Sequence, residues 1–198
     1  MIKAVVFDLD GVYFDKGKKN FVNNISEKFK VNKELFWDFF INSDLMIKYK
    51  KGKISKNQFW SKTIEKFHIK STPDELLRIL KEGYEICPKT VRLVRRLRKV
   101  GIKTIICSDN FKERIEVLQE RFNFLNDFDL VVLSYAYGML KPALLRKIVK
   151  ASSFKPEELV VIDDNKKTIE EAKRNGFKAI LCENPEKIGI KLKQFGVL

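Results

Sequence analysis

Five short apolar runs, each bounded by polar residues or glycine, constrain most strongly how this chain can fold. Each run is rich in β-branched residues and too short for a helix, which is typical of strands buried on both faces of a parallel sheet. Helical patterns alternate with the last four runs, and Gly101 and Gly176 stand where two of these helices should end. This alternation predicts an α/β fold with a doubly wound parallel sheet. The predicted strands are Ile2–Phe7, Lys103–Cys107, Leu130–Leu133, Leu159–Ile162 and Lys178–Leu181.

A long helical stretch interrupts this rhythm after the first strand. Residues 15–83 contain no strand-like pattern, and their apolar spacing suits helices, as in the run Leu35, Phe36, Phe39 and Phe40. We therefore predict two domains, an α/β core of residues 1–14 and 84–198 and an inserted helical domain of residues 15–83. Expected helices cover residues 21–29, 33–47, 56–67 and 73–83 in the insert and 89–100, 111–122, 143–151, 167–175 and 185–195 in the core.

The chain is strongly basic, with 40 Lys and Arg against 26 Asp and Glu and a formal net charge of +14 over 198 residues. Such a charge attracts anions in general. A nucleic-acid footprint, however, gathers on one face, whereas these basic residues are spread along the chain. The densest cluster, within residues 92–99, alternates with the apolar positions of one amphipathic helix and indicates a solvated face. We therefore expect no nucleic-acid partner.

Cysteine usage and hydropathy bear on location. Cys87, Cys107 and Cys182 are far apart and form no CxxC pair, which favours reduced thiols. The apolar run at the N-terminus is short and broken by Asp8, and no other stretch approaches the roughly 20 apolar residues that span a bilayer. We expect a cytoplasmic protein without membrane association, either a monomer or a homodimer.

Polar side chains follow four of the predicted strands. In an open parallel sheet, ligands bind beyond the carboxyl ends of the strands, so these side chains should meet at one edge. The residues concerned are Asp8 and Asp10 after the first strand, Ser108, Asp109 and Asn110 after the second, Lys141 in the loop after the third, and Asp163 and Asp164 after the fourth.

This set of groups suits phosphoryl transfer. Clustered carboxylates repel one another, and a hard cation such as Mg²⁺ relieves the repulsion. A carboxylate beside that cation can attack phosphorus, and a second one nearby can protonate the leaving oxygen and then activate water. Lysine and a hydroxyl can hold phosphoryl oxygens. Each element alone has an ordinary structural explanation, such as a helix N-cap, but together they predict a site for a small-molecule phosphate ester.

Four motifs identify a resemblance. They are VVFDLDGV (Val5–Val12), IICSDN (Ile105–Asn110), SYAYGMLKP (Ser134–Pro142) and VVIDDN (Val160–Asn165). In these motifs and their order the chain resembles the haloacid dehalogenase (HAD) superfamily of phosphatases, and the place of the helical insert resembles a C1-type cap. The resemblance implies a Rossmann-like core and Mg²⁺-dependent hydrolysis of a phosphate monoester through an aspartyl-phosphate intermediate.

The resemblance also implies roles for individual residues. Asp8 would be the nucleophile and a metal ligand, and Asp10 the general acid/base with its backbone carbonyl on the metal. Asp164 and Asp163 would complete the Mg²⁺ site, either of them as the direct ligand. The phosphate-binding residues implied are Ser108, Asp109, Asn110 and Lys141, with added amide contacts from Gly11 and the Asn110 backbone.

Three alternatives stay open on the same fold. A phosphosugar mutase resembles this chain but typically has a hinge histidine, whereas the single histidine here is His68 within the insert. Family 2-haloacid dehalogenases lack the second aspartate, which is present as Asp10. A non-catalytic binding protein usually loses the first aspartate or the fourth motif, and both are intact.

Substrate choice is expected to come from the insert. The basic turn at residues 50–53 lies between two predicted helices, and in related C1 caps a turn in this region dips toward the active site. We expect Lys51, Lys53 or Lys56 to contact an anionic group of the substrate. A solvated basic turn explains the same residues equally well.

Overall fold

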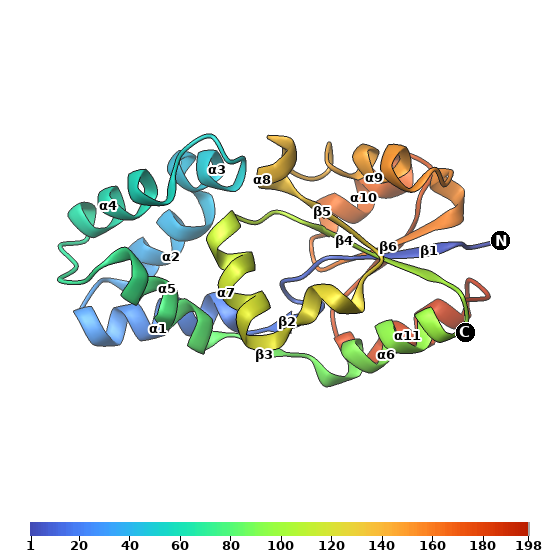
Figure 1. Cartoon of the computed structure of the whole chain (residues 1–198), viewed down its shortest axis with the longest axis horizontal. Helices are drawn as coiled ribbons and strands as arrows, with labels where there is room; N and C mark the ends of the chain where they lie inside the picture. The colour runs from blue at the N-terminus through green and yellow to red at the C-terminus, as the bar shows by residue number, and fades with distance from the viewer. Residues whose placement is uncertain (198) are drawn as a thin grey trace.

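Strand β1 (Ala4–Phe7) lies at the centre of a five-stranded sheet in the computed structural model, which describes residues 1–197 (Figure 1). All neighbouring strands pair in parallel, in the order β5-β4-β1-β6-β7. The predicted α/β fold with a parallel sheet is therefore confirmed. Residue 198, the last of the predicted core range, lies outside the described residues. The other strands are β4 (Lys103–Ser108), β5 (Leu130–Leu133), β6 (Leu159–Asp163) and β7 (Lys178–Leu181).

Helices cover both faces of this sheet because side chains alternate along each strand. In β1, Val5 and Phe7 join one apolar cluster while Ala4 and Val6 join another. The first cluster includes apolar residues of α6 (Pro88–Lys99), α7 (Lys112–Phe122) and α11 (Ile188–Lys193). The second includes those of α9 (Leu145–Ser152) and α10 (Lys166–Arg174). Burial on both faces explains the continuous apolar runs of the sequence.

Five helices follow β1 and lie beyond the carboxyl ends of the strands (Figure 1). The prediction of a single helix over residues 33–47 is wrong, because Ser43 interrupts the helix. This residue has extended backbone angles, and its Oγ accepts a hydrogen bond from Met46 N at 3.1 Å, which caps a new helix. The five are α1 (Gly17–Phe29), α2 (Lys33–Asn42), α3 (Asp44–Lys50), α4 (Lys56–Lys66) and α5 (Pro73–Gly83).

A two-stranded antiparallel ribbon joins these helices to the sheet. It pairs β2 (Phe14–Asp15) with β3 (Glu85–Ile86), and strands this short leave no periodic signal in the sequence. Both ends of the predicted insert fall at this ribbon. We keep the division into a core of residues 1–14 and 84–198 and an insert of residues 15–83 as a proposal.

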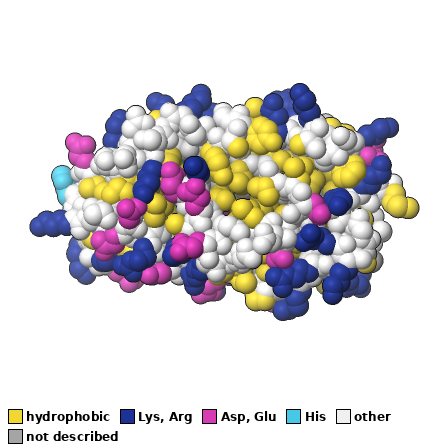
Figure 2. Space-filling view, viewed as in Figure 1, with side chains coloured by type: hydrophobic (Ala, Val, Ile, Leu, Met, Phe, Trp, Pro, Cys, Tyr) yellow, Lys and Arg dark blue, Asp and Glu magenta, His cyan; other side chains and the backbone are white. Residues whose placement is uncertain are grey.

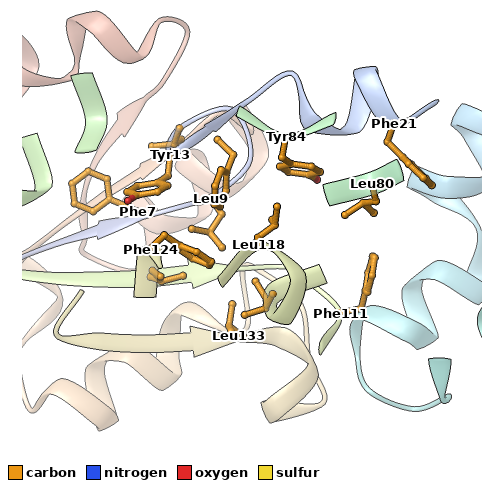
Figure 3. Close-up of a cluster of buried hydrophobic side chains, with 14 of the residues drawn as sticks. Phe7, Leu9, Tyr13, Phe21, Leu80, Tyr84, Phe111, Leu118, Phe124 and Leu133 are labelled. Atoms are coloured by element: carbon orange, nitrogen blue, oxygen red, sulfur yellow. The ribbon is translucent and has the colours of Figure 1, made fainter. Parts of the chain in front are cut away.

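The apolar core continues from the sheet into the helical insert (Figure 3). The Phe14 and Tyr84 rings meet edge to face, with centroids 5.7 Å apart. Further out, the Tyr49 ring of α3 stacks between Phe59 of α4 and Phe111, which precedes α7, with centroids 4.5 Å from each. The insert is thus packed against the core directly above the strand ends.

Short segments complete the chain. Helix α8 (Ser134–Tyr137) follows β5, and single 3₁₀ turns cover Phe124–Asp127, Pro156–Glu158 and Pro185–Lys187. The last of these precedes α11, so the helix expected over residues 185–195 is split. No helix within residues 1–197 combines the length and the apolar character needed to cross a membrane.

Basic side chains are scattered among acidic ones on the face drawn in Figure 2. Part of the basic cluster on α6 has acidic partners: Arg95 Nε lies 3.0 Å from Asp127 Oδ1, and Arg98 Nε lies 3.8 Å from Asp129 Oδ2. This pairing agrees with a solvated helix face.

Candidate active site

Three strand ends bring polar side chains into contact. Asp8 follows β1, Ser108 ends β4 and Asp163 ends β6, and the two flanking strands both pair with β1. Ser108 Oγ donates to Asp8 Oδ1 at 2.7 Å. The sequence therefore placed these groups correctly at one edge of the sheet, where the strand order reverses and ligands bind in such folds.

Lys141 lies between two of these carboxylates. Its Nζ is 3.0 Å from Asp8 Oδ2 and 2.5 Å from Asp163 Oδ2, and its own backbone N–H donates to Asp109 Oδ1 at 2.9 Å. Burial alone would lower the pKa of Lys141, but Asp8, Asp163 and Asp109 outweigh it and raise the pKa well above its ordinary value. Lys141 is thus a fixed positive charge beside Asp8.

Asp8, Asp163 and Asp164 form a cluster of acidic ligands. Each offers a carboxylate oxygen, and these atoms all lie within 4.8 Å of one another. Burial and the charge of Asp8 raise the pKa of Asp163 to about 6, and the same two causes raise the pKa of Asp164. A hard divalent cation such as Mg²⁺ would relieve this repulsion between like charges, and it prefers an all-oxygen donor set of this kind.

Gly11 lets Asp164 approach the first strand. Its φ of +71° lies in the left-handed region, and a Cβ at this position would lie 2.3 Å from Asp164 Oδ2. Any other residue would push that carboxylate away. The glycine after Asp10 therefore serves the geometry of the acidic cluster.

Asp10 sits in a buried network that the sequence analysis missed. Arg114 Nη2 lies 2.7 Å from Asp10 Oδ2, Lys18 Nζ lies 3.1 Å from the same oxygen, and the Tyr84 hydroxyl donates to Oδ1 at 3.1 Å. Burial would raise the pKa of Asp10, but the charges of Arg114 and Lys18 outweigh it and hold the pKa well below its usual range. Asp10 is therefore a carboxylate in this structure.

Asn110 links this network to the phosphate-binding residues expected from the sequence. Its Nδ2 donates to Ser108 Oγ at 3.0 Å, and its Oδ1 accepts from Arg114. Its backbone N–H donates to Ser134 Oγ at 2.9 Å, and the same oxygen lies 2.7 Å from the Lys50 carbonyl of α3. The loop after β4 is thus linked to the insert through the Ser134 hydroxyl.

A cavity of about 190 Å³ opens above these groups. Strand-end residues line it, and from the insert it is lined by Lys18 of α1, Ile41 of α2 and Lys50 of α3. Lys51, Lys53 and Lys56 do not line it, and Lys56 pairs with Asp74 instead. The strand-end and loop residues that the sequence named and that line the cavity are Asp8, Asp10, Ser108, Asp109, Lys141, Asp163 and Asp164.

Known proteins share this sequence pattern and architecture. The model of the haloacid dehalogenase-like hydrolase family matches residues 2–176. A phosphoglycolate phosphatase of Aquifex aeolicus is 26% identical over 192 residues, which cover 91% of this chain and 84% of that protein. An uncharacterized protein of Dictyostelium discoideum is 27% identical over 144 residues, and this match spans only 62% of its length.

Solved structures show the same fold at low sequence identity. A HAD family enzyme of Bacteroides thetaiotaomicron, determined in complex with magnesium and inorganic phosphate, superposes with a TM-score of 0.79 and 19% identity, covering 91% of this chain and 93% of its own. An L-2-haloacid dehalogenase of Xanthobacter autotrophicus superposes with a TM-score of 0.67 and 19% identity, covering 100% of this chain and 85% of its own. The likeness extends over core and insert together.

Proposed function

Because the chain belongs to the haloacid dehalogenase-like hydrolase family, we propose that it hydrolyses a small phosphate monoester with Mg²⁺ through an aspartyl-phosphate on Asp8. The observation that carries this proposal is the placement of Lys141 between Asp8 and Asp163, with Ser108 on the other oxygen of Asp8. A nucleophilic carboxylate, a buried cation and a hydroxyl thus converge on one point, as transfer of an anionic phosphoryl group requires.

In the first step, Asp8 attacks phosphorus and the bond to the ester oxygen breaks. Ser108 and Lys141 hold phosphoryl oxygens and offset the charge that develops on them. The leaving alkoxide takes a proton from Asp10. In the second step, water attacks phosphorus, its proton passes to Asp10, and the bond from phosphorus to Asp8 breaks to release inorganic phosphate.

The surroundings of Asp10 favour its base form. Arg114 and Lys18 stabilise the carboxylate, which suits the step in which water loses a proton. For the first step Asp10 must carry a proton. A phosphate dianion bound beside it raises its pKa by charge repulsion and so favours that protonated form.

Asp8 and Asp164, with the Asp10 backbone carbonyl, would hold Mg²⁺. Bound there, the cation offsets negative charge on the phosphoryl oxygens and on Asp8. Asp163 already contacts Lys141 and accepts from Asn165 N at 2.8 Å, whereas the structure records no such partner for the exposed Asp164 among residues 1–197. This difference favours Asp164 as the direct ligand and Asp163 as the residue that holds Lys141.

The cavity favours a small substrate. Its volume of about 190 Å³ is below the roughly 300–1,000 Å³ of common ligand pockets, so a phosphoryl group leaves room for few further atoms. The relative from Aquifex aeolicus is named for phosphoglycolate, a compound of this size. A nucleotide is too large for the cavity in this conformation.

Dehalogenation is the second candidate on this fold, supported by the likeness to the Xanthobacter enzyme. A halide leaves without taking a proton, so Asp10 would have no role as an acid in the first step of that reaction. The divalent cation that the acidic cluster of Asp8, Asp163 and Asp164 fits would likewise have no phosphoryl oxygens to neutralise. Both features favour the phosphatase.

The test compares two substrates. We expect hydrolysis of p-nitrophenyl phosphate that needs Mg²⁺, stops with EDTA and is lost in Asp8→Asn, and no chloride release from 2-chloropropionate. Chloride release without phosphate release would show that the protein is a dehalogenase and not a phosphatase. Circular dichroism of Asp8→Asn provides the control for folding.

A further inference from the structure

Lys50 faces the cavity without a partner for its charge. It is the last residue of α3, it is half-buried, and it lines the same cavity as Asp8 and Ser108. Within residues 1–197, the structure records no hydrogen bond and no ion pair for its Nζ. A desolvated ammonium group without a counter-charge is costly. In accord with this, burial and the neighbouring charges of Lys18 and Arg114 lower the pKa of Lys50 to about 7.

The carboxylates near Lys50 have other partners. Arg114 and Lys18 pair with Asp10. The ammonium group of Lys141 pairs with Asp8 and Asp163, and its backbone N–H donates to Asp109. An ion pair of Lys50 with Asp8, Asp10 or Asp163 would therefore remove a partner from another cation, and Asp164 is the proposed ligand of Mg²⁺. An anion brought by a ligand would give Lys50 a partner without that loss.

Lys18 lines the same cavity, and its charge is among those that lower the pKa of Lys50. It belongs to the first turn of α1, and its side chain is 30% exposed. One contact, at 3.1 Å to Asp10, leaves donors of its ammonium group unused. Lys18 and Lys50 both come from helices of the insert, whereas Asp8, Ser108 and Asp163 come from the strand ends.

We propose that Lys50 and Lys18 form a second anion-binding subsite, so that the substrate is a small phosphate ester with a further anionic group a few atoms from its phosphate. This inference rests on the proposed function, since Asp8, Ser108 and Lys141 must receive the phosphoryl end. The second group is a carboxylate or another phosphate, because either accepts charge-assisted hydrogen bonds from lysine. The cavity volume of about 190 Å³ limits the spacer to a short carbon chain.

The experiment compares esters that differ in the second group alone. The probes are ethyl phosphate, phosphoglycolate and ethylene glycol bisphosphate, which carry no second charge, a carboxylate and a second phosphate. Steady-state kcat and KM are measured for the wild type, Lys50→Gln and Lys50→Arg. Lys48→Gln, an exposed position of the same helix outside the cavity, is the matched control.

We expect the wild type to favour one of the charged esters over ethyl phosphate. Lys50→Gln should lower kcat/KM for that ester about tenfold or more, mainly through KM, and change the value for ethyl phosphate little. Lys50→Arg should restore part of the loss, and Lys48→Gln should match the wild type. The preferred ester identifies the second group as carboxylate or phosphate.

Two results overturn the proposal in distinguishable ways. Equal kcat/KM for all three esters, or an equal loss for all three in Lys50→Gln, would refute the subsite while leaving the phosphatase intact. Turnover of none of the esters by the wild type would refute the proposed function and the subsite with it. A folding defect would also lower kcat for every ester, so an equal loss counts against the subsite once the circular dichroism spectrum of Lys50→Gln matches that of the wild type.

Discussion

Arg114 meets Asp10 inside the protein: its Nη2 lies 2.7 Å from Oδ2, and the Arg114 side chain is 1% exposed. The same guanidinium donates to the Tyr84 hydroxyl at 2.8 Å and to Asn110. A buried arginine in contact with a buried carboxylate ties α7 to the loop after β1. This pair therefore contributes both to stability and to the position of Asp10.

Removing Arg114 should destabilise the fold. Arg114→Met leaves Asp10 buried with less positive charge beside it, so we expect a loss of about 3–5 kcal/mol in the free energy of unfolding, measured in urea. The double variant with Asp10→Asn should lose less than the sum of the single variants. Arg92→Met, at an exposed position of α6, is the control. A loss below about 1 kcal/mol would show that the pair is unimportant for stability.

Lys141 should matter for both activity and charge balance. Lys141→Met removes the cation between Asp8 and Asp163, and we expect kcat to fall by about 10²–10³-fold. Because the two carboxylates then repel each other, the melting temperature should drop in EDTA and recover partly with Mg²⁺. Melting temperatures of this variant that are the same with EDTA and with Mg²⁺ would contradict this reading of the acidic cluster.

Mg²⁺ binding should strengthen with pH. The pKa of Asp163 is raised to about 6 and that of Asp164 is raised as well, so both bind protons in the folded state more tightly than in the unfolded state. In the metal-free protein this lowers stability as pH rises from about 4 through 6. Mg²⁺ requires the deprotonated groups, so the rise in melting temperature on adding Mg²⁺ should grow between pH 5 and about pH 7. A Mg²⁺ effect independent of pH would show that the protonation of neither carboxylate is linked to Mg²⁺ binding.

Alanine substitutions at Gly11 and Gly101 test whether Gly11 is needed for the close approach of Asp164. Both have positive φ, but a Cβ on Gly11 would clash with Asp164, whereas a Cβ on Gly101 would meet nothing within 4 Å. Gly101→Ala should therefore cost about 1–2 kcal/mol of stability and leave Mg²⁺ affinity unchanged. Gly11→Ala should weaken Mg²⁺ binding in isothermal titration as well. Equal Mg²⁺ affinities in the two variants would contradict the role given to Gly11.

The strand ends could be predicted because burial on both faces demands apolar runs, and the parallel order then brings their carboxyl ends together. The break at Ser43 left only the short polar run of residues 42–44 as a signal, since apolar residues resume directly after it and Met46 is buried in turn. The ribbon of β2 and β3 is too short for any periodicity.

The sequence also could not show which lysine of the insert faces the cavity. Successive residues of a helix point about 100° apart, so the orientation of α3 decides between Lys50 and Lys51. Arg114, by contrast, left a signal. It shares a helix face with Phe111, Ile115 and Leu118, all buried, and a charged residue at such a position needs a buried partner.

The covalent intermediate on Asp8 is the central claim, and chemical trapping tests it most directly. The enzyme is mixed with Mg²⁺ and p-nitrophenyl phosphate, quenched, and treated with borohydride, which reduces an acyl phosphate to the alcohol. Mass spectrometry of the peptide that contains Asp8 should then show conversion of this residue to homoserine, and none in the enzyme without substrate. An unmodified Asp8 under turnover, with reduction at another carboxylate or at none, would contradict the account.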